Sequence, residues 1–138
     1  MSNARHTDFG GVVTASPGPS AGLRHLARVS ADYSDRADAY APLATAAAQA
    51  EAEYRTAKAK AILREKAAAD GKLSIAEAEA RADADDHIAG LLMARLTSRA
   101  VADSHLEKLR QLRSQVDVGR SFTAAERAAD AATAPFHP

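Results

Sequence analysis

One glycine turn, Asp70-Gly71-Lys72, separates two alanine-rich stretches of nearly equal length, and this symmetry constrains the fold more than any other feature. Alanine favours helix and lets two helices approach closely. The 138-residue chain has no Trp, three Phe and three Tyr, so its 46% hydrophobic content buries little area per residue. We therefore expect an all-α protein, a long antiparallel, coiled-coil-like helical hairpin whose narrow seam favours oligomerisation.

A heptad repeat runs through the first stretch, which we predict to be helical over about residues 23–69. One core position holds Leu26, Tyr33, Tyr40, Ala47, Tyr54, Ala61 and Ala68, and the other holds Val29, Arg36, Leu43, Ala50, Ala57 and Arg64. Eleven of these thirteen residues are apolar or Tyr, which is typical of a coiled coil.

Pro42 lies inside this stretch, yet the heptad phase is the same on both sides of it. The unchanged phase favours one helix that is kinked or tightly interrupted at Pro42 but keeps a continuous face. The alternative makes Pro42 the first-turn residue of a new helix and leaves residues 23–40 as a separate arm.

The second stretch begins with a capping box, Ser74-Ile75-Ala76-Glu77. In this motif the Ser oxygen accepts the Glu backbone N–H, and the Glu side chain returns to the Ser amide. We predict a turn over residues 70–73 and a second helix over about residues 74–118, which Gly119 ends.

Both ends of the chain are expected to lie outside the hairpin, which spans residues 21–118. Residues 1–20 contain Gly, Pro, Ser and Thr and predict a flexible tail, with a docking segment around Phe9 to Thr14 as the alternative. A second capping box, Thr123 to Glu126, predicts a short helix to about Ala132 within residues 119–138, followed by a frayed tail.

Charges in the two stretches are mirrored about residue 71. Residues 55–66 carry five basic side chains against Glu65, and residues 76–87 carry five acidic side chains against Arg81. Farther out, Asp32, Asp35 and Asp38 face a segment that contains Arg99, Lys108, Arg110 and Arg113. Opposite charges would meet along an antiparallel pair, within one chain or between two swapped chains. The dipole of each separate helix offers another explanation of the inner match.

The sequence contains no pattern that predicts catalysis, a cofactor or a metal centre. Its five His are scattered, and Asp83 with His87 fits an acidic first turn better than a metal site. His105 shares a stripe with Leu109 and indicates a seam histidine, with a proton switch as the alternative. A two-helix rod rarely forms the concave pocket that an enzyme needs, so we expect no enzyme, cofactor or small-molecule substrate.

Composition narrows the partners and the compartment. Lys plus Arg and Asp plus Glu number 18 each, so the chain lacks the basic signature of a nucleic-acid binder, and DNA binding is not favoured. It has no cysteine, its first residues contain no apolar signal-peptide core, and no apolar run approaches a membrane span. We expect a cytoplasmic protein that is neither secreted nor membrane-bound.

Three segments carry a family resemblance: residues 53–61 (EYRTAKAKA), 71–79 (GKLSIAEAE) and 106–114 (LEKLRQLRS). Together they resemble small, mostly uncharacterised helical proteins of actinobacterial phages, over about residues 51–121. The resemblance implies a coiled-coil hairpin encoded by a phage and located in the host cytoplasm. Some of those proteins lie near recombination genes, and the resemblance assigns no functional residue.

We predict a non-enzymatic helical hairpin that acts through protein–protein interaction or self-association. A two-helix rod cannot bury every leucine, so we expect an exposed, partner-binding stripe formed by Leu92, Leu96, Leu106 and Leu109. One alternative is an accessory factor in phage DNA recombination or replication that binds a DNA enzyme or single-stranded DNA weakly. A second alternative is a virion or assembly component.

Overall fold

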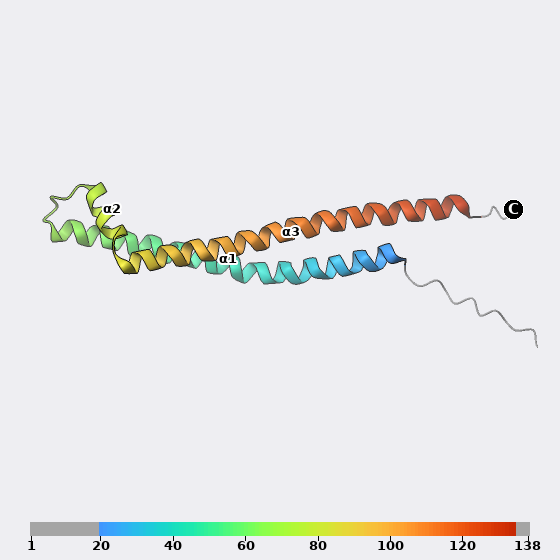
Figure 1. Ribbon diagram of the computed structural model, residues 1–138, viewed down its shortest axis with the longest axis horizontal. Helices are drawn as coiled ribbons and strands as arrows, with labels where there is room; N and C mark the ends of the chain where they lie inside the picture. The colour runs from blue at the N-terminus through green and yellow to red at the C-terminus, as the bar shows by residue number, and fades with distance from the viewer. Residues whose placement is uncertain (1–19, 135–138) are drawn as a thin grey trace, which may run out of the picture.

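The computed structural model describes residues 20–134, which form three helices and no strand. These are α1 (Ala21–Ala68), α2 (Ile75–Asp83) and α3 (Asp86–Thr133). The two long helices, α1 and α3, lie side by side and run in opposite directions, so the molecule is a thin rod (Figure 1). The short α2 packs mainly on α1 at one end of the rod (Figure 1). The prediction of an all-helical protein with a long packed helix pair is confirmed.

The heptad of α1 forms its contact face with α3. Eleven of its thirteen core positions are buried or half-buried, and only Arg64 and Ala68, at the C-terminal end, are exposed. Ser20 caps the start of α1 by accepting a hydrogen bond from the Leu23 amide at 3.2 Å. The remainder of the predicted tail, including the segment around Phe9 to Thr14, lies outside the described residues.

α1 continues through Pro42, which excludes the alternative of a separate arm over residues 23–40. Proline lacks an N–H, so the carbonyl of Asp38 loses its helical donor. Both Pro42 and Asp38 are exposed, and water can satisfy that carbonyl oxygen. The helix therefore keeps one continuous contact face across the proline.

The turn after α1 uses two consecutive residues with positive φ. Asp70 has φ 51° and Gly71 has φ 73°. The Gly71 amide donates to the Lys66 carbonyl at 2.8 Å, and the Asp70 amide donates to the Ala67 carbonyl at 3.2 Å. This is the Schellman arrangement, in which the first left-handed residue past the helix is normally Gly. Here Asp70 occupies that position and Gly71 follows it.

The capping box at Ser74 is present as predicted. Ser74 Oγ accepts from the Glu77 amide at 3.2 Å, and Glu77 Oε2 accepts from the Ser74 amide at 2.9 Å. The hydrogen bonds from the Ser74 backbone and hydroxyl lower the pKa of the Glu77 carboxyl below its usual value.

We expect Ser74→Ala to lower the free energy of unfolding by about 0.5–2 kcal/mol, because it removes the side-chain acceptor at the start of α2. Thermal unfolding followed by circular dichroism measures this change. The matched control is Ser104→Ala on the exposed face of α3, which should leave the melting temperature unchanged or slightly higher. Equal behaviour of the two variants would contradict the role of the cap.

The predicted second helix over residues 74–118 is wrong in both its continuity and its end. It breaks after Asp83, because the Asp85 side chain caps a new helix by accepting from the amides of His87 at 2.8 Å and Ile88 at 3.3 Å. The new helix, α3, then continues past Gly119 to Thr133.

Packing explains why Gly119 does not end the helix. A Cβ at Gly119 would lie 3.1 Å from Leu26 Cδ1, so the glycine makes room for a leucine of α1. Thr123 is buried and donates to the Gly119 carbonyl at 2.9 Å instead of capping a separate helix. The short helix predicted within residues 119–138 is therefore the last part of α3.

Two apolar clusters hold the rod together. The inner cluster, near α2, contains Tyr54, Ala61, Ala82 and Ile88, with Ala57, Ile62, Leu91 and Leu92 packed against it. The outer cluster, near the free ends of α1 and α3, contains Val29, Leu112 and Val116, with Leu26 and Tyr33 packed against it. Between the two clusters, Ala102 and Leu109 of α3 are buried in the seam.

Candidate interaction groove

A groove of about 370 Å³ opens between α1 and α3, between the two apolar clusters. We call it the central groove. Its α1 wall consists of Tyr40, Ala44, Ala47, Ala48 and Glu51, and its α3 wall consists of Arg95, Leu96, Arg99, Ala102, Asp103 and Leu106. The α1 wall is low because three of its residues are alanines. The α3 wall is higher and carries two leucines between charged side chains.

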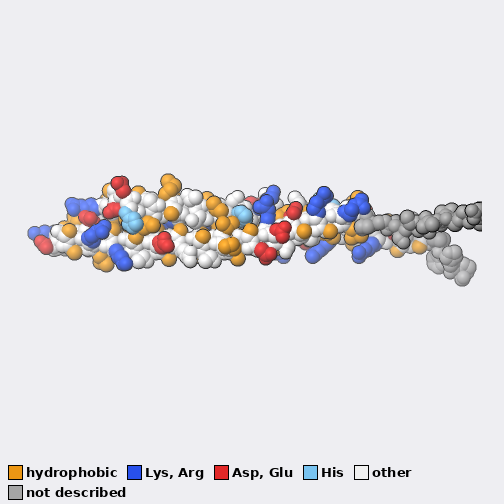
Figure 2. All heavy atoms as spheres, turned by 90° about the horizontal axis from the view of Figure 1, so that it is seen from below, with side chains coloured by type: hydrophobic (Ala, Val, Ile, Leu, Met, Phe, Trp, Pro, Cys, Tyr) orange, Lys and Arg blue, Asp and Glu red, His pale blue; other side chains and the backbone are white. Residues whose placement is uncertain are grey.

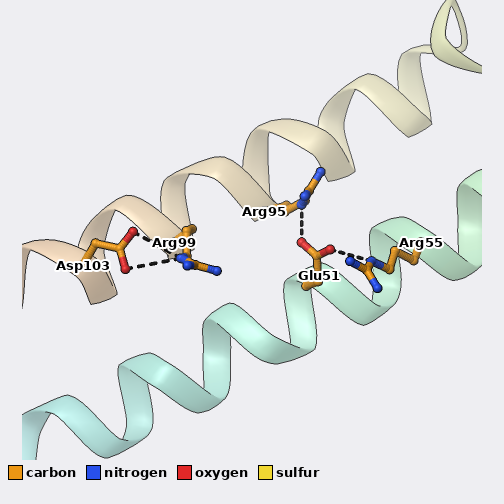
Figure 3. Close-up of polar contacts among 5 residues, drawn as sticks. All are labelled: Glu51, Arg55, Arg95, Arg99 and Asp103. Atoms are coloured by element: carbon orange, nitrogen blue, oxygen red, sulfur yellow. Dashed lines mark hydrogen bonds and ion pairs between the residues drawn. The ribbon is translucent and has the colours of Figure 1, made fainter. Parts of the chain in front are cut away.

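Glu51 and Arg95 close one end of the central groove. Arg95 Nε, from α3, donates to Glu51 Oε2, and Arg55 Nε donates to Glu51 Oε1 at 2.6 Å (Figure 3). Burial alone would raise the pKa of the Glu51 carboxyl, but the hydrogen bonds from Arg95 and Arg55 outweigh it and hold the pKa below its usual value. This ion pair bridges the two long helices.

Tyr54 anchors the same end of the groove to the inner cluster. The Arg95 guanidinium lies 5.1 Å from the centroid of the buried Tyr54 ring, and Lys58 Nζ lies 5.9 Å from it. Both distances fit cation–π attraction. Lys58 also pairs with Asp83 of α2 at 2.9 Å, and the hydrogen bond to Asp83 raises the pKa of the Lys58 ammonium. Tyr54 thus couples all three helices.

Arg99 and Asp103 form the rim of the groove on α3. Arg99 Nε donates to the two Asp103 carboxylate oxygens at 3.2 Å and 3.3 Å (Figure 3). Their side chains are 74% and 59% exposed, so they remain open to a partner. An exposed pair of this kind contributes little to the stability of a single chain.

The four leucines predicted to form an exposed stripe do not share one exposed face. Leu96, at 54% exposure, and the half-buried Leu106 line the central groove. Leu92 packs against the inner cluster, and Leu109 is 9% exposed in the seam. The prediction of an exposed Leu109 is wrong, because Leu109 lies seven residues after Ala102 and seven before Val116, both of which are buried. Their binding to a partner stays a prediction.

The charge mirror is present in its inner half. Lys58 pairs with Asp83, and Arg64 pairs with Asp85 at 3.5 Å, so members of the two predicted sets meet. The two residues of minority sign, Glu65 and Arg81, also pair, at 3.8 Å.

In the outer half of the mirror, no ion pair joins the acidic residues of α1 to the basic residues of α3 among residues 20–134. Arg99 pairs with Asp103 and Arg110 pairs with Glu107, all within α3. Asp32, Asp35 and Lys108 instead line a hollow beside His105. Figure 2 shows basic and acidic side chains interspersed along one face of the rod.

The other residues considered from the sequence do not converge on a site. Asp83 ends α2 whereas His87 lies in the first turn of α3, so the two do not share one helix. No group of three His, Cys, Asp or Glu in residues 20–134 is arranged to hold a metal ion. The Nδ1 atom of His105 is buried and has no hydrogen-bond partner in the described structure.

Comparison with known proteins gives no relative for this chain: no family model, no curated protein and no solved structure matches it. None of the three described helices combines the length and apolar character needed to cross a membrane. The function is therefore inferred from the central groove itself.

Proposed function

We propose that this protein acts without catalysis, as an antiparallel coiled-coil hairpin that binds another protein chain through the central groove. The observation that carries the proposal is the position of Leu96, which is 54% exposed on the wall of a groove whose opposite wall consists mostly of alanine. Exposed leucine beside small residues is the surface against which a helix packs its apolar face.

The charged rim supports the same proposal. Arg99 and Asp103 flank the apolar wall, and Arg95 with Glu51 closes one end. Charges around an apolar centre set the orientation of a partner more than they set its affinity. Because Arg95 is held by both Glu51 and the Tyr54 ring, this end of the surface is ordered before a partner arrives.

Leu96→Glu should abolish association of the protein, because it places a charge in the apolar contact. The matched control is Leu63→Glu, since Leu63 is 68% exposed on α1 and lies outside the groove. Sedimentation equilibrium and co-purification measure self-association and partner binding, and circular dichroism checks that both variants remain helical. The proposal is wrong if wild type is monomeric and no partner co-purifies with it. It is also wrong if wild type and both variants associate to the same extent.

Binding to DNA, as an accessory factor in phage recombination or replication, remains the second candidate. Arg113 and Arg120 line a hollow with Tyr33 on the outer half of the rod, and this arrangement favours it. Two observations weaken the DNA-binding candidate. Asp117 lines the same hollow, and two of the basic residues within 55–66, Lys58 and Arg64, are paired with aspartates. Tight DNA binding that falls steeply with salt would favour this candidate over the first. The phage origin and a virion role stay predictions from the sequence.

A further inference from the structure

The α3 wall of the central groove has a self-complementary order of side chains. Reading along α3, it presents Leu96, then Arg99, then Asp103, then Leu106. The two leucines are centred on residue 101, and so are the two charged residues. Turning this helix end for end about residue 101 therefore exchanges leucine with leucine and arginine with aspartate.

We propose that the occupant of the central groove is a second copy of this chain, related by a two-fold axis at the level of Val101. The proposal rests on the proposed function of the groove and names its partner. In this arrangement the two α3 helices run in opposite directions. Leu96 of each copy then covers Leu106 of the other, and Arg99 of each copy faces Asp103 of the other. A two-fold contact of this kind uses the same patch on both copies.

The shape of the groove leaves room for the second α3. At this level of the rod, the α1 wall presents Ala44, Ala47 and Ala48. Alanine lets helices approach closely, so an α3 from another copy can lie over the groove and contact both walls. Leu96 would lose its solvent exposure in that contact, which is the main apolar gain.

The charges favour an antiparallel over a parallel pairing of the two α3 helices. Within one chain Arg99 and Asp103 already lie 3.2 Å apart and both point away from the core. In the antiparallel pairing, the two arginines and two aspartates alternate around the axis, so each charge has an opposite neighbour in both copies. A parallel pairing about the same residues would place Arg99 against Arg99, and like charges in contact disfavour it.

Two charge-reversed variants test the register without relying on any unknown partner. Arg99→Glu makes all four charges around the axis acidic in its own dimer, and Asp103→Arg makes all four basic. The dissociation constant of each variant's own dimer should be at least about tenfold higher than that of the wild-type dimer. An equimolar mixture should recover association as a heterodimer, because each acidic side chain of one copy then faces an arginine of the other. The intrachain pair remains broken in the mixture, so recovery can come only from contacts between chains.

Cysteine cross-linking provides a second readout that does not depend on charge, since the chain has no cysteine of its own. A mixture of Leu96→Cys with Leu106→Cys should form a disulfide between chains. Neither variant alone should do so, because like positions would be separated by about 15 Å along the helix.

The outcomes separate this proposal from the proposed function of the groove. If wild type is dimeric and sensitive to Leu96→Glu but neither mixture gives a heterodimer, the two-fold register is wrong and the groove remains the interface. If wild type stays monomeric at all concentrations, the second copy is wrong, and Leu96→Glu then tests binding of a different protein. The register is established if association recovers, and the disulfide forms, in the mixtures but not in the single variants.

Discussion

Tyr54→Ala should lower the free energy of unfolding by about 3–5 kcal/mol, the range for truncating a buried large aromatic side chain. Tyr54 is 8% exposed and belongs to the inner cluster with Ala61, Ala82 and Ile88. Its ring also lies against Arg95 and Lys58, so the truncation removes two cation–π contacts in addition to apolar packing. Urea denaturation at one fixed protein concentration measures the loss, because any association adds to apparent stability.

Two control variants separate the contributions of the Tyr54 ring. Tyr54→Phe keeps the ring and its face for both cations, so it should retain most of the stability. Tyr33→Ala truncates a half-buried tyrosine of the outer cluster and should cost less than Tyr54→Ala. Equal losses for Tyr33→Ala and Tyr54→Ala would contradict the central place of the inner cluster.

Pro42→Ala should raise the free energy of unfolding by up to about 3 kcal/mol, the difference between proline and alanine inside a helix. The structure keeps α1 helical through Pro42, and the new N–H could donate to the Asp38 carbonyl. Pro42 is exposed, so its replacement leaves the seam with α3 intact. Thermal and urea unfolding both report the gain.

The control for this substitution is Gln49→Ala, at another exposed position of the same helix. It should change stability by no more than a few tenths of a kcal/mol, because both residues are good helix formers. A lower melting temperature for Pro42→Ala would contradict the prediction and show that α1 needs the proline to follow α3.

The features of the fold that depend on local sequence could be predicted. The α1 heptad identified its contact face because nearly all of its core positions are apolar or Tyr, and the Ser74 box located the start of α2. The break at Asp85 was missed because a side chain that caps from inside a helical pattern leaves the periodicity almost unchanged. The continuation past Gly119 was missed because it depends on Leu26, 93 residues earlier in the chain.

The candidate site was predicted less well, and the reason lies in the contact face of α3. That face repeats every seven residues from Ile88 to Thr123, but Arg95 occupies one of its core positions, and His105 lies beside them in the seam. These polar residues hide the repeat, so the leucines alone suggested a stripe that included the buried Leu109. If polar residues are allowed at core positions, the heptad of α3 places Leu109 in the buried contact face and Leu96 outside it.

The most direct test of the hairpin is a disulfide between its two free ends. In the structure a Cβ at Gly119 would lie 3.7 Å from Leu26 Cβ, within the range that a disulfide requires. The protein with Leu26→Cys and Gly119→Cys has no other cysteine. A control pair, Leu26→Cys with Ser98→Cys, places the second thiol about 30 Å farther along α3.

Mild oxidation of the Leu26→Cys, Gly119→Cys protein should give a disulfide within one chain, seen as a monomer of altered mobility on a non-reducing gel and by mass spectrometry. The control pair should form no such bond under the same conditions. Disulfides exclusively between chains, or no faster oxidation than in the control, would contradict the claim that α1 and α3 of one chain pack side by side in opposite directions.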